Sequence, residues 1–469
     1  MLKTFAAVSL AISAQAGAQT ASSGEAQFRS LYKELVETNT VVDRGSCTLA
    51  AQRMATRLKA AGFTTKQLTL FSVPEHPKDG GLVAVYPGTD KSLKPLLLLA
   101  HIDVVEAKSA DWTRDPFKLV EENGYFYGRG TADDKAQAAI WTDMLVRFSR
   151  EHYRPKRTIK MALTCGEETD GAFNGASWLS QNRRELIDAG FALNEGGGGR
   201  TDGKGVSQGG HVVVQTVQVG EKAYQDFTLT ATNPGGHSSQ PVRENAIYAM
   251  SDALAKVREL EFPIEFTDTT HLYFNKVGAM RGDAVGKAMI ALVANPQDRA
   301  AEAIVNQDKQ LHSMLRTTCV PTLIDGGHAL NALPQKVTAN VNCRMFPGRT
   351  TEETRAAIMA AIGNPAISVE PRVRGKPIAK APPLDPAVIG PMQAMVAKYF
   401  PGVPFLPTMS TGATDSLYLA AAGIPSYGVP GGWGDPDGNG AHGLNERLEV
   451  KSIMTARDFL TELVKTYTQ

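Results

Sequence analysis

Histidine and carboxylate side chains recur in this sequence directly after apolar segments that look like strands. His101 and Asp103 follow the apolar run LLLLA, and both are residue types that bind or orient metal ions. In a strand, residues i and i+2 point to the same side, so these two side chains should lie together. A single histidine–aspartate pair is more often an ordinary polar strand end than a metal site. Its function therefore depends on what the rest of the chain places beside it.

Four further acidic or histidine sets follow other apolar segments. Each has an ordinary explanation when taken alone, such as a helix N-cap for an aspartate pair or a solvated turn for a glutamate pair. In an open α/β sheet, however, the carboxyl ends of strands are where ligands bind. Buried carboxylates repel one another unless a cation neutralises them, and oxygen and imidazole ligands without cysteine are typical of catalytic zinc. The sets are Asp133 and Asp134 in YGRGTADDK, Glu167 and Glu168 in CGEETDG, Glu195 in FALNEGGGG, and His442 in GDPDGNGAHGLNE.

The elements that must position these residues alternate between strands and helices. Strand-like segments occupy 81–88, 95–105 and 158–168, and residues 133–151 have the pattern of an amphipathic helix. This alternation predicts an α/β fold with a mostly parallel sheet. Near residue 220 the pattern becomes strand, helix, strand, helix, which is typical of a smaller α+β domain.

The sequence therefore predicts one discontinuous catalytic domain that is interrupted by a lid. We expect residues 23–218 and 376–469 to form the catalytic domain and residues 219–375 to form the lid. The stretch 260–317 is less regular and is interpreted as an elaboration of the lid.

Charge and hydropathy exclude some classes of partner. The formal net charge is +1, and no basic run with interleaved aromatic residues is present, so we expect no nucleic-acid partner. Residues 1–18 combine Lys3, a short apolar run and small-x-small sites, which is typical of a removable signal peptide. No other segment reaches membrane-spanning length. The chain is therefore predicted to be exported, and to be periplasmic or secreted; the alternative for residues 1–18 is a frayed helix.

The four cysteines are consistent with export but do not establish it. Cys319 and Cys343 lie almost symmetrically about the GGHALNALPQ turn and could face each other across a strand pair. Whether they form a disulfide is left open by the sequence. Cys47 and Cys165 lie in apolar surroundings and are interpreted as small buried side chains.

Eight motifs together resemble one known family across nearly the whole chain after the signal peptide. The family is that of the dinuclear zinc aminoacylases and carboxypeptidases, which includes glutamate carboxypeptidase, succinyl-diaminopimelate desuccinylase and carnosinase-like dipeptidases. The long lid most resembles the branch of the vacuolar carboxypeptidase and the secreted N-acyl amino acid hydrolases. The motifs are AHIDVV, GRGTADDK, CGEETDG, LNEGGG, PGGHSS, NALPQ, CRMFPG and GAHGLNE.

The resemblance implies two Zn²⁺ ions per chain, for which Co²⁺ or Mn²⁺ could substitute. It implies that Asp133 bridges the two ions, that His101 and Glu195 complete one site, and that Glu168 and His442 complete the other. It also implies a cis peptide bond between Asp133 and Asp134.

Two neighbouring carboxylates have further implied roles. Asp103 would hold the far ring nitrogen of His101 and so orient the imidazole. Glu167 would act as the general base that removes a proton from the attacking water.

Four residues resemble groups of the family that contact the substrate. His237 would stabilise the oxyanion, and Arg344 and Asn331 would hold a substrate carboxylate. Gly412 would let the backbone approach the substrate closely. The ordinary alternatives are a surface ion pair for Arg344 and a simple turn for Gly412.

The implied function is hydrolysis of the amide bond of dipeptides, of short peptides at their C-terminal residue, or of N-acyl amino acids. An aminopeptidase-type member is the alternative enzyme. Acidic residues in place of Arg344 and Asn331 would favour it, and they are absent here. A metal-binding relic without catalysis is the alternative outside enzymes, but such a relic should lack the base or a ligand. The resemblance also implies a homodimer through the lid, whereas the enlarged stretch 260–317 could instead make a monomer complete.

Overall fold

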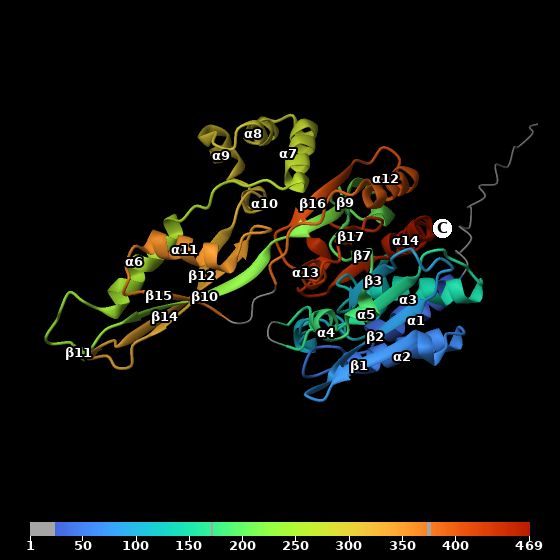
Figure 1. Ribbon diagram of the computed structural model, residues 1–469, viewed down its shortest axis with the longest axis horizontal. Coiled ribbons are helices and arrows are strands. Elements are labelled where there is room, and N and C mark those ends of the chain that lie inside the picture. Colours follow the sequence, from blue (N-terminus) through green and yellow to red (C-terminus); the bar gives the residue numbers. More distant parts are fainter. Residues whose placement is uncertain (1–23, 170–171, 373–376) are drawn as a thin grey trace, which may run out of the picture.

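The computed structural model describes residues 24–169, 172–372 and 377–469. The expected signal peptide at 1–18 lies outside these residues. The described chain forms a main body and an elongated lid that projects from it (Figure 1). No helix within the described residues is long and apolar enough to cross a membrane.

A large sheet forms the centre of the main body. Its central strands β6, β3, β7 and β17 run parallel, whereas β1 and β2 form an antiparallel edge beside β6. This arrangement confirms the predicted α/β fold with a mostly parallel sheet. In spatial order the strands are β1 (Leu68–Val73), β2 (His76–Tyr86), β6 (Ile159–Thr164), β3 (Leu96–His101), β7 (Phe191–Asn194), β17 (Ser426–Gly428), β9 (Val212–Glu221), β8 (Gly198–Thr201) and β18 (Trp433–Gly434), with β16 (Phe405–Ser410) paired to β9.

Helices cover both faces of this sheet. Successive side chains of a strand point to opposite faces, so Leu96 and Leu98 of β3 enter one core while Leu97 and Leu99 enter another. Burial on both sides explains why this strand is a continuous apolar run. The first core is covered by α1 (Glu25–Val36), α2 (Cys47–Ala60), α3 (Lys135–Arg150), α12 (Pro386–Tyr399) and α14 (Val450–Thr468), and the second by α4 (Gly175–Asn182), α5 (Arg184–Ile187) and α13 (Ser416–Ala421).

A small antiparallel sheet lies at the edge of the main body. It consists of β4 (Val120–Glu122), β5 (Tyr125–Tyr127) and β19 (Arg447–Glu449). Because β19 leads directly into α14, this sheet ties the last helix to the loop that precedes α3.

The lid is an antiparallel sheet with two helices packed on it, as the sequence predicts. The chain leaves the main sheet at the end of β9 and enters the lid with β10, and it returns to the main body before α12. These crossings lie close to the expected boundaries at residues 219 and 376, which we keep as the proposed domain division. The elements are β10 (Ala223–Thr232), β12 (Thr318–Gly326), β14 (Lys336–Met345), β15 (Ser368–Pro371), α6 (Ala246–Glu259) and α11 (Thr351–Ile362), with the short pair β11 (Gly236–His237) and β13 (Ala332–Leu333) at the tip.

The interpretation of residues 260–317 as less regular is wrong. This stretch contains four helices with a core of their own, built around Phe274, Met289 and Leu292. The missed signal is a set of short polar caps, because the side chains of Thr267 and Asp283 accept backbone N–H groups at two of the helix starts. The helices are α7 (Asp268–Arg281), α8 (Ala284–Ala294), α9 (Arg299–Val305) and α10 (Lys309–Met314).

Both cysteine pairs form disulfides. Cys319 and Cys343 are register partners on β12 and β14, so they face each other across a strand pair, and the disulfide that the sequence left open is formed. Cys47 and Cys165 are also bonded to each other, which corrects their interpretation as merely small buried side chains. They are separated by 118 residues: Cys47 begins α2, which packs on β2, and Cys165 follows β6, the strand that pairs with β2.

Candidate metal centre

The main sheet brings most of the candidate residues to one edge. His101 is the last residue of β3, and its register partner Thr164 is the last residue of the parallel strand β6. Glu168 follows β6, and Glu195 follows β7 on the other side of β3. Parallel neighbours end on the same edge, so these side chains converge there. Asp133 reaches the same place from the loop before α3.

Two groups of possible ligands share Asp133. One contains His101, Asp133 and Glu195, the other contains Asp133, Glu168 and His442, and within each group the ligand atoms lie within 4.8 Å of one another. The five predicted ligands therefore form the two groups that the resemblance implies. The peptide bond between Asp133 and Asp134 is cis, as expected.

The carboxylate of Asp133 faces a histidine on each side. Its Oδ1 lies 3.0 Å from Nε2 of His101, and its Oδ2 lies 3.1 Å from Nε2 of His442. Nε2 of His442 is also 2.9 Å from Oε2 of Glu168, and Nε2 of His101 is 3.8 Å from Oε1 of Glu195. One carboxylate that offers a separate oxygen to each group is the arrangement that a bridging ligand requires.

The electrostatics of this cluster show how much it lacks positive charge. Burial raises the pKa of Glu195 well above its usual value, and burial also raises the pKa of Glu168. Hydrogen bonds to Asp133 and Glu168 raise the pKa of His442 to about 10. Burial alone would raise the pKa of Asp133, but the two facing histidines lower it. Without a cation, the protein therefore holds protons among carboxylates that would otherwise repel one another.

The donor set fits divalent cations. Oε1 of Glu195 and Oδ2 of Asp134 are buried atoms without a hydrogen-bond donor among the described residues. A buried carboxylate oxygen without a partner is costly unless a cation or a proton satisfies it. Two imidazole nitrogens and three carboxylates, with no cysteine, form a ligand set that suits catalytic zinc and related ions.

Asp103 lies beside His101 but contacts it differently from the expectation. Nδ1 of His101 is 3.1 Å from the backbone carbonyl oxygen of Asp103 and 3.6 Å from its carboxylate Oδ1. The closer partner is thus the backbone, because 3.6 Å is beyond hydrogen-bond range. Oδ2 of Asp103 instead accepts the backbone N–H of Glu168 at 3.0 Å. Asp103 therefore links the loop that carries Glu168 to the end of β3, which carries His101.

Glu167 lies in the same acidic cluster. Its charge raises the pKa of Asp134 and of Glu195, after the larger effect of burial. Its neighbour Glu168 faces His442, so the two consecutive glutamates occupy different parts of the centre. This division is what separate ligand and base roles require.

Glu446 is a residue of this centre whose role the sequence analysis missed. Its side chain is fully buried, and its Oε1 accepts the backbone N–H groups of Ala132 and Asp133 at 2.7 and 3.1 Å. Its Oε2 accepts the backbone N–H of Gly130 at 2.9 Å and pairs with Arg129 at 2.7 Å. Glu446 is the glutamate of GAHGLNE, so the only sequence signal was its place in that motif, four residues after His442.

The four candidate substrate residues lie in two separate regions, two at the tip of the lid and two at its root. His237 and Asn331 lie at the lid tip, where the backbone N–H of Ser238 donates to the carbonyl of Asn331 at 3.0 Å. Figure 1 shows this tip, marked by β11, at the far end of the lid from the main sheet. The structure therefore does not bring His237 or Asn331 to the metal centre of the same chain.

Arg344 and Gly412 lie instead at the root of the lid. The guanidinium of Arg344 stacks over the ring of Tyr224 at 4.9 Å, near the start of β10. The backbone N–H of Lys222 donates to the carbonyl of Ser410, whose hydroxyl accepts the N–H of Gly412. This short chain of contacts places both residues where the lid joins the main body.

Comparison with known proteins is consistent with this geometry. Residues 97–466 match the sequence pattern of Peptidase family M20/M25/M40. The human N-fatty-acyl-amino acid synthase/hydrolase PM20D1 is 27% identical over 416 residues, which cover 86% of this chain and 80% of that protein. The probable carboxypeptidase S-like 2 of Dictyostelium discoideum is 28% identical over 397 residues, which cover 82% and 74%.

A solved structure shows the same fold. The M20 family metallo-carboxypeptidase from Sulfolobus solfataricus superimposes with a TM-score of 0.69 at 17% sequence identity, covering 94% of this chain and 99% of that one. The match to the family extends over most of the chain and includes every candidate ligand. This protein belongs to peptidase family M20/M25/M40 and is a hydrolase of that family.

Proposed function

We propose that this protein is a two-zinc hydrolase that cleaves the amide bond of N-acyl amino acids, dipeptides or short peptides with a free C-terminal carboxylate. The observation that supports this most strongly is the pair of ligand groups that share Asp133. The names of two relatives, an N-fatty-acyl-amino acid synthase/hydrolase and a probable carboxypeptidase, describe enzymes for substrates of this kind.

Each side chain of the centre has a part in the proposed reaction. Two bound divalent ions would polarise the amide carbonyl and lower the pKa of a water molecule held between His101, Glu168 and their partners. Glu167 removes a proton from that water as its oxygen attacks the carbonyl carbon. Glu167 then delivers the proton to the amide nitrogen as the C–N bond breaks, so the products are a carboxylate and a free amine.

The lid residues would bind the substrate from two chains. Arg344 lies at the lid root, where its guanidinium stacks over Tyr224, and it offers a planar pair of donors for a carboxylate. His237 and Asn331 at the tip lie far from their own metal centre, so we propose that they serve the partner subunit of a homodimer. The strand β12 supports this, because it lies at an edge of the lid sheet and pairs only with β14 among the described strands. Its Val320, Leu323 and Ile324 side chains are exposed.

The two alternatives are less consistent with the structure. An aminopeptidase-type member needs acidic groups for a substrate amine, whereas Arg344 at the lid root is a cation. A relic without catalysis should have lost a ligand or the base, yet Glu167 and both ligand groups are in place. We also keep the proposal of an exported protein, which rests on the signal-like residues 1–18.

The test is hydrolysis of a mixed panel by zinc-loaded protein, followed by mass spectrometry. The panel contains N-acyl amino acids, dipeptides with free termini and peptides with an amidated C-terminus. We expect cleavage of the first two classes and none of the amidated peptides, because these lack the carboxylate. The Glu167→Gln variant should keep its metal and lose at least about 100-fold in rate. Cleavage of amidated peptides at equal rates would favour the aminopeptidase alternative.

A further inference from the structure

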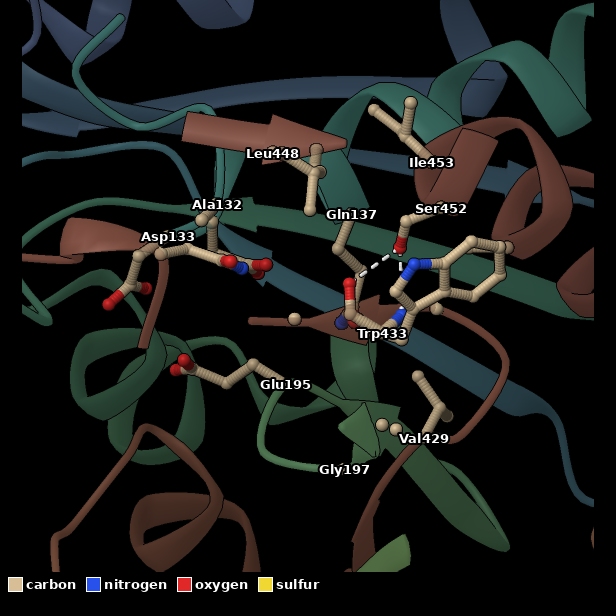
Figure 2. Close-up of a pocket in the computed structure, with 18 of the residues that line it drawn as sticks. Ala132, Asp133, Gln137, Glu195, Gly197, Val429, Trp433, Leu448, Ser452 and Ile453 are labelled. Atoms are coloured by element: carbon tan, nitrogen blue, oxygen red, sulfur yellow. Dashed lines mark hydrogen bonds between the residues drawn. The ribbon is translucent and has the colours of Figure 1, made fainter. Parts of the chain in front are cut away.

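A cavity of about 290 Å³ adjoins the metal centre inside the main body. Figure 2 shows Asp133 and Glu195 on one side of this cavity and Trp433, Ser452 and Ile453 on the opposite side. A molecule bound at the metal centre could therefore extend away from the lid and into the space between α3 and α14.

The far wall of the cavity is mostly apolar and is held by hydrogen bonds, although Gln137, Asn439 and Ser452 also line the space. The backbone N–H of Trp433 donates to Oγ of Ser452, which in turn donates to the carbonyl of Trp433, both at 2.7 Å. The indole N–H donates to Glu449, which fixes the ring as a wall. The apolar side chains that line the cavity include Ile140 of α3, Leu448 of β19, Ile453, Ala456 and Leu460 of α14, and Val429.

A run of four glycines lines the cavity next to Glu195. Residues 196–199 run from Glu195 into β8, and none of them carries a side chain. A Cβ atom at Gly197 would lie 2.4 Å from the carbonyl oxygen of Val429, so the strand after β7 can pass this close only as glycine. The wall beside the metal centre is therefore bare backbone.

The charges around the cavity decide which part of a substrate it accepts. Asp133, Asp134 and Glu195 lie at its metal end, and its lining contains no lysine, arginine or histidine. An anionic group deep in the cavity, beyond the metal ligands, would find no cation, whereas Arg344 at the lid root offers one. The amino-acid carboxylate should therefore face the lid, and the neutral acyl part should face the cavity.

We propose that this cavity is the binding site for an unbranched apolar acyl chain, so that the preferred substrates are N-acyl amino acids with medium-length acyl groups. This inference rests on the proposed amide hydrolysis and narrows its substrate class. A methylene group needs about the volume of one water molecule in the liquid, roughly 30 Å³. The cavity of about 290 Å³ thus holds an acyl chain of about ten carbons.

The experiment measures kcat/KM for one amino acid that carries acyl groups of two to sixteen carbons. We expect kcat/KM to rise about fourfold for each added methylene until the cavity is filled near ten carbons, and then to fall. An acyl group of ten carbons that ends in a second carboxylate should be a poor substrate, because it places an anion in a cavity without a cation.

Two variants of α14 should move the optimum in opposite directions. Ala456 and Leu460 are four residues apart and therefore lie on the same face of the helix. Ala456→Leu adds three carbons to the cavity wall and should shorten the preferred chain by about three carbons. Leu460→Ala removes three and should lengthen it by about as much. Leu463→Ala is the matched control, because Leu463 is a fully buried residue of the same helix that does not line the cavity.

A binding measurement separates this inference from the activity. Decanoate and acetate are titrated into the metal-loaded enzyme by calorimetry, and Ala456→Leu should weaken the binding of decanoate at least tenfold and leave that of acetate unchanged. If the enzyme hydrolyses N-acyl amino acids with no dependence on chain length, or if both variants keep the wild-type optimum, the acyl site is wrong and the hydrolase remains. If no amide is hydrolysed but decanoate binding still responds to Ala456→Leu, the cavity binds acyl chains and the proposed function is wrong.

Discussion

Glu446 holds the backbone of Asp133 in place, although 313 residues separate them in the chain. The fully buried carboxylate of Glu446 accepts the N–H of Asp133 and pairs with Arg129 in the same loop. The bridging candidate therefore depends for its position on a residue that is not itself one of the candidate ligands. The loop after η4 (Gly438–Gly440) thus supplies both a possible ligand, His442, and the support for another.

Glu446→Gln should weaken metal binding without removing a ligand. An amide cannot accept all the N–H groups that the carboxylate accepts, and it leaves the buried Arg129 without its counter-charge. We expect the free energy of unfolding to fall by about 3 kcal/mol and metal affinity to fall by about 10- to 100-fold. Thermal unfolding and metal titration measure the two effects. Glu462→Gln, a surface change in α14, is the control, and equal metal affinity in both variants would contradict the support role.

Substitutions of Asp133 and of His101 should reduce the metal content by different amounts. Because Asp133 belongs to both ligand groups, Asp133→Asn should reduce metal content from two ions per chain to less than one. His101→Ala should reduce it only to about one, because His101 belongs to a single group. Elemental analysis after zinc saturation and gel filtration gives these numbers. A wild-type content of one ion would show that the two groups do not form a dinuclear site.

Metal binding should release a proton from His442. Asp133 and Glu168 raise the pKa of this histidine to about 10 in the metal-free protein, so the ring is charged at neutral pH. A metal ion needs the neutral ring, and it must therefore displace the proton. We expect zinc affinity to weaken as the pH falls from 8 to 6, and titrations in buffers of different ionisation enthalpy to show the release. His442→Ala should lower the number of protons released by about one, and an affinity independent of pH would refute this.

The Cys47–Cys165 disulfide should stabilise the metal centre as well as the fold. Cys165 lies two residues before Glu167, and its sulfur lies within 4.8 Å of an oxygen of Asp103. Closing a loop of 118 residues is worth about 5 kcal/mol in the chain-entropy account, compared with about 3 kcal/mol for the 24-residue loop of Cys319 and Cys343.

Replacing each pair by alanine tests this difference. We expect the Cys47→Ala, Cys165→Ala protein to lose more stability and also some metal affinity, because the loop of Glu168 loses its anchor. The Cys319→Ala, Cys343→Ala protein should keep wild-type metal affinity, since that bond lies within the lid sheet. Chemical denaturation and metal titration distinguish the two, and the prediction is wrong if both lose metal affinity equally.

His237 should act on the metal centre of the partner subunit. A mixture of inactive Glu167→Gln and inactive His237→Ala proteins forms heterodimers in which one centre has both groups. We therefore expect up to about a quarter of wild-type activity to return once subunits have exchanged, since half the chains are in heterodimers and each heterodimer has one competent centre. Exchange is followed with two affinity tags. Confirmed exchange without regained activity would show that His237 serves its own chain.

The local sequence determined the class of the main fold and the place of its chemistry. The leucines of β3 point to both faces of the sheet, and the polar residues begin where the strand ends. Both the strand and the site were therefore visible in one short segment. Glu168 and Glu195 follow β6 and β7 in the same way. This worked because burial of a parallel strand and the chemistry at its end depend on consecutive residues.

Contacts between distant segments were decided only by the tertiary structure. The carboxylate of Glu446, the bond between Cys47 and Cys165, and the hydrogen bond from Glu168 to Asp103 each join elements that no local pattern connects. The distance of His237 from its own centre is likewise a property of the whole lid. A periodic pattern reports which face of an element is buried, whereas the partner on that face is chosen by how all the elements pack in three dimensions.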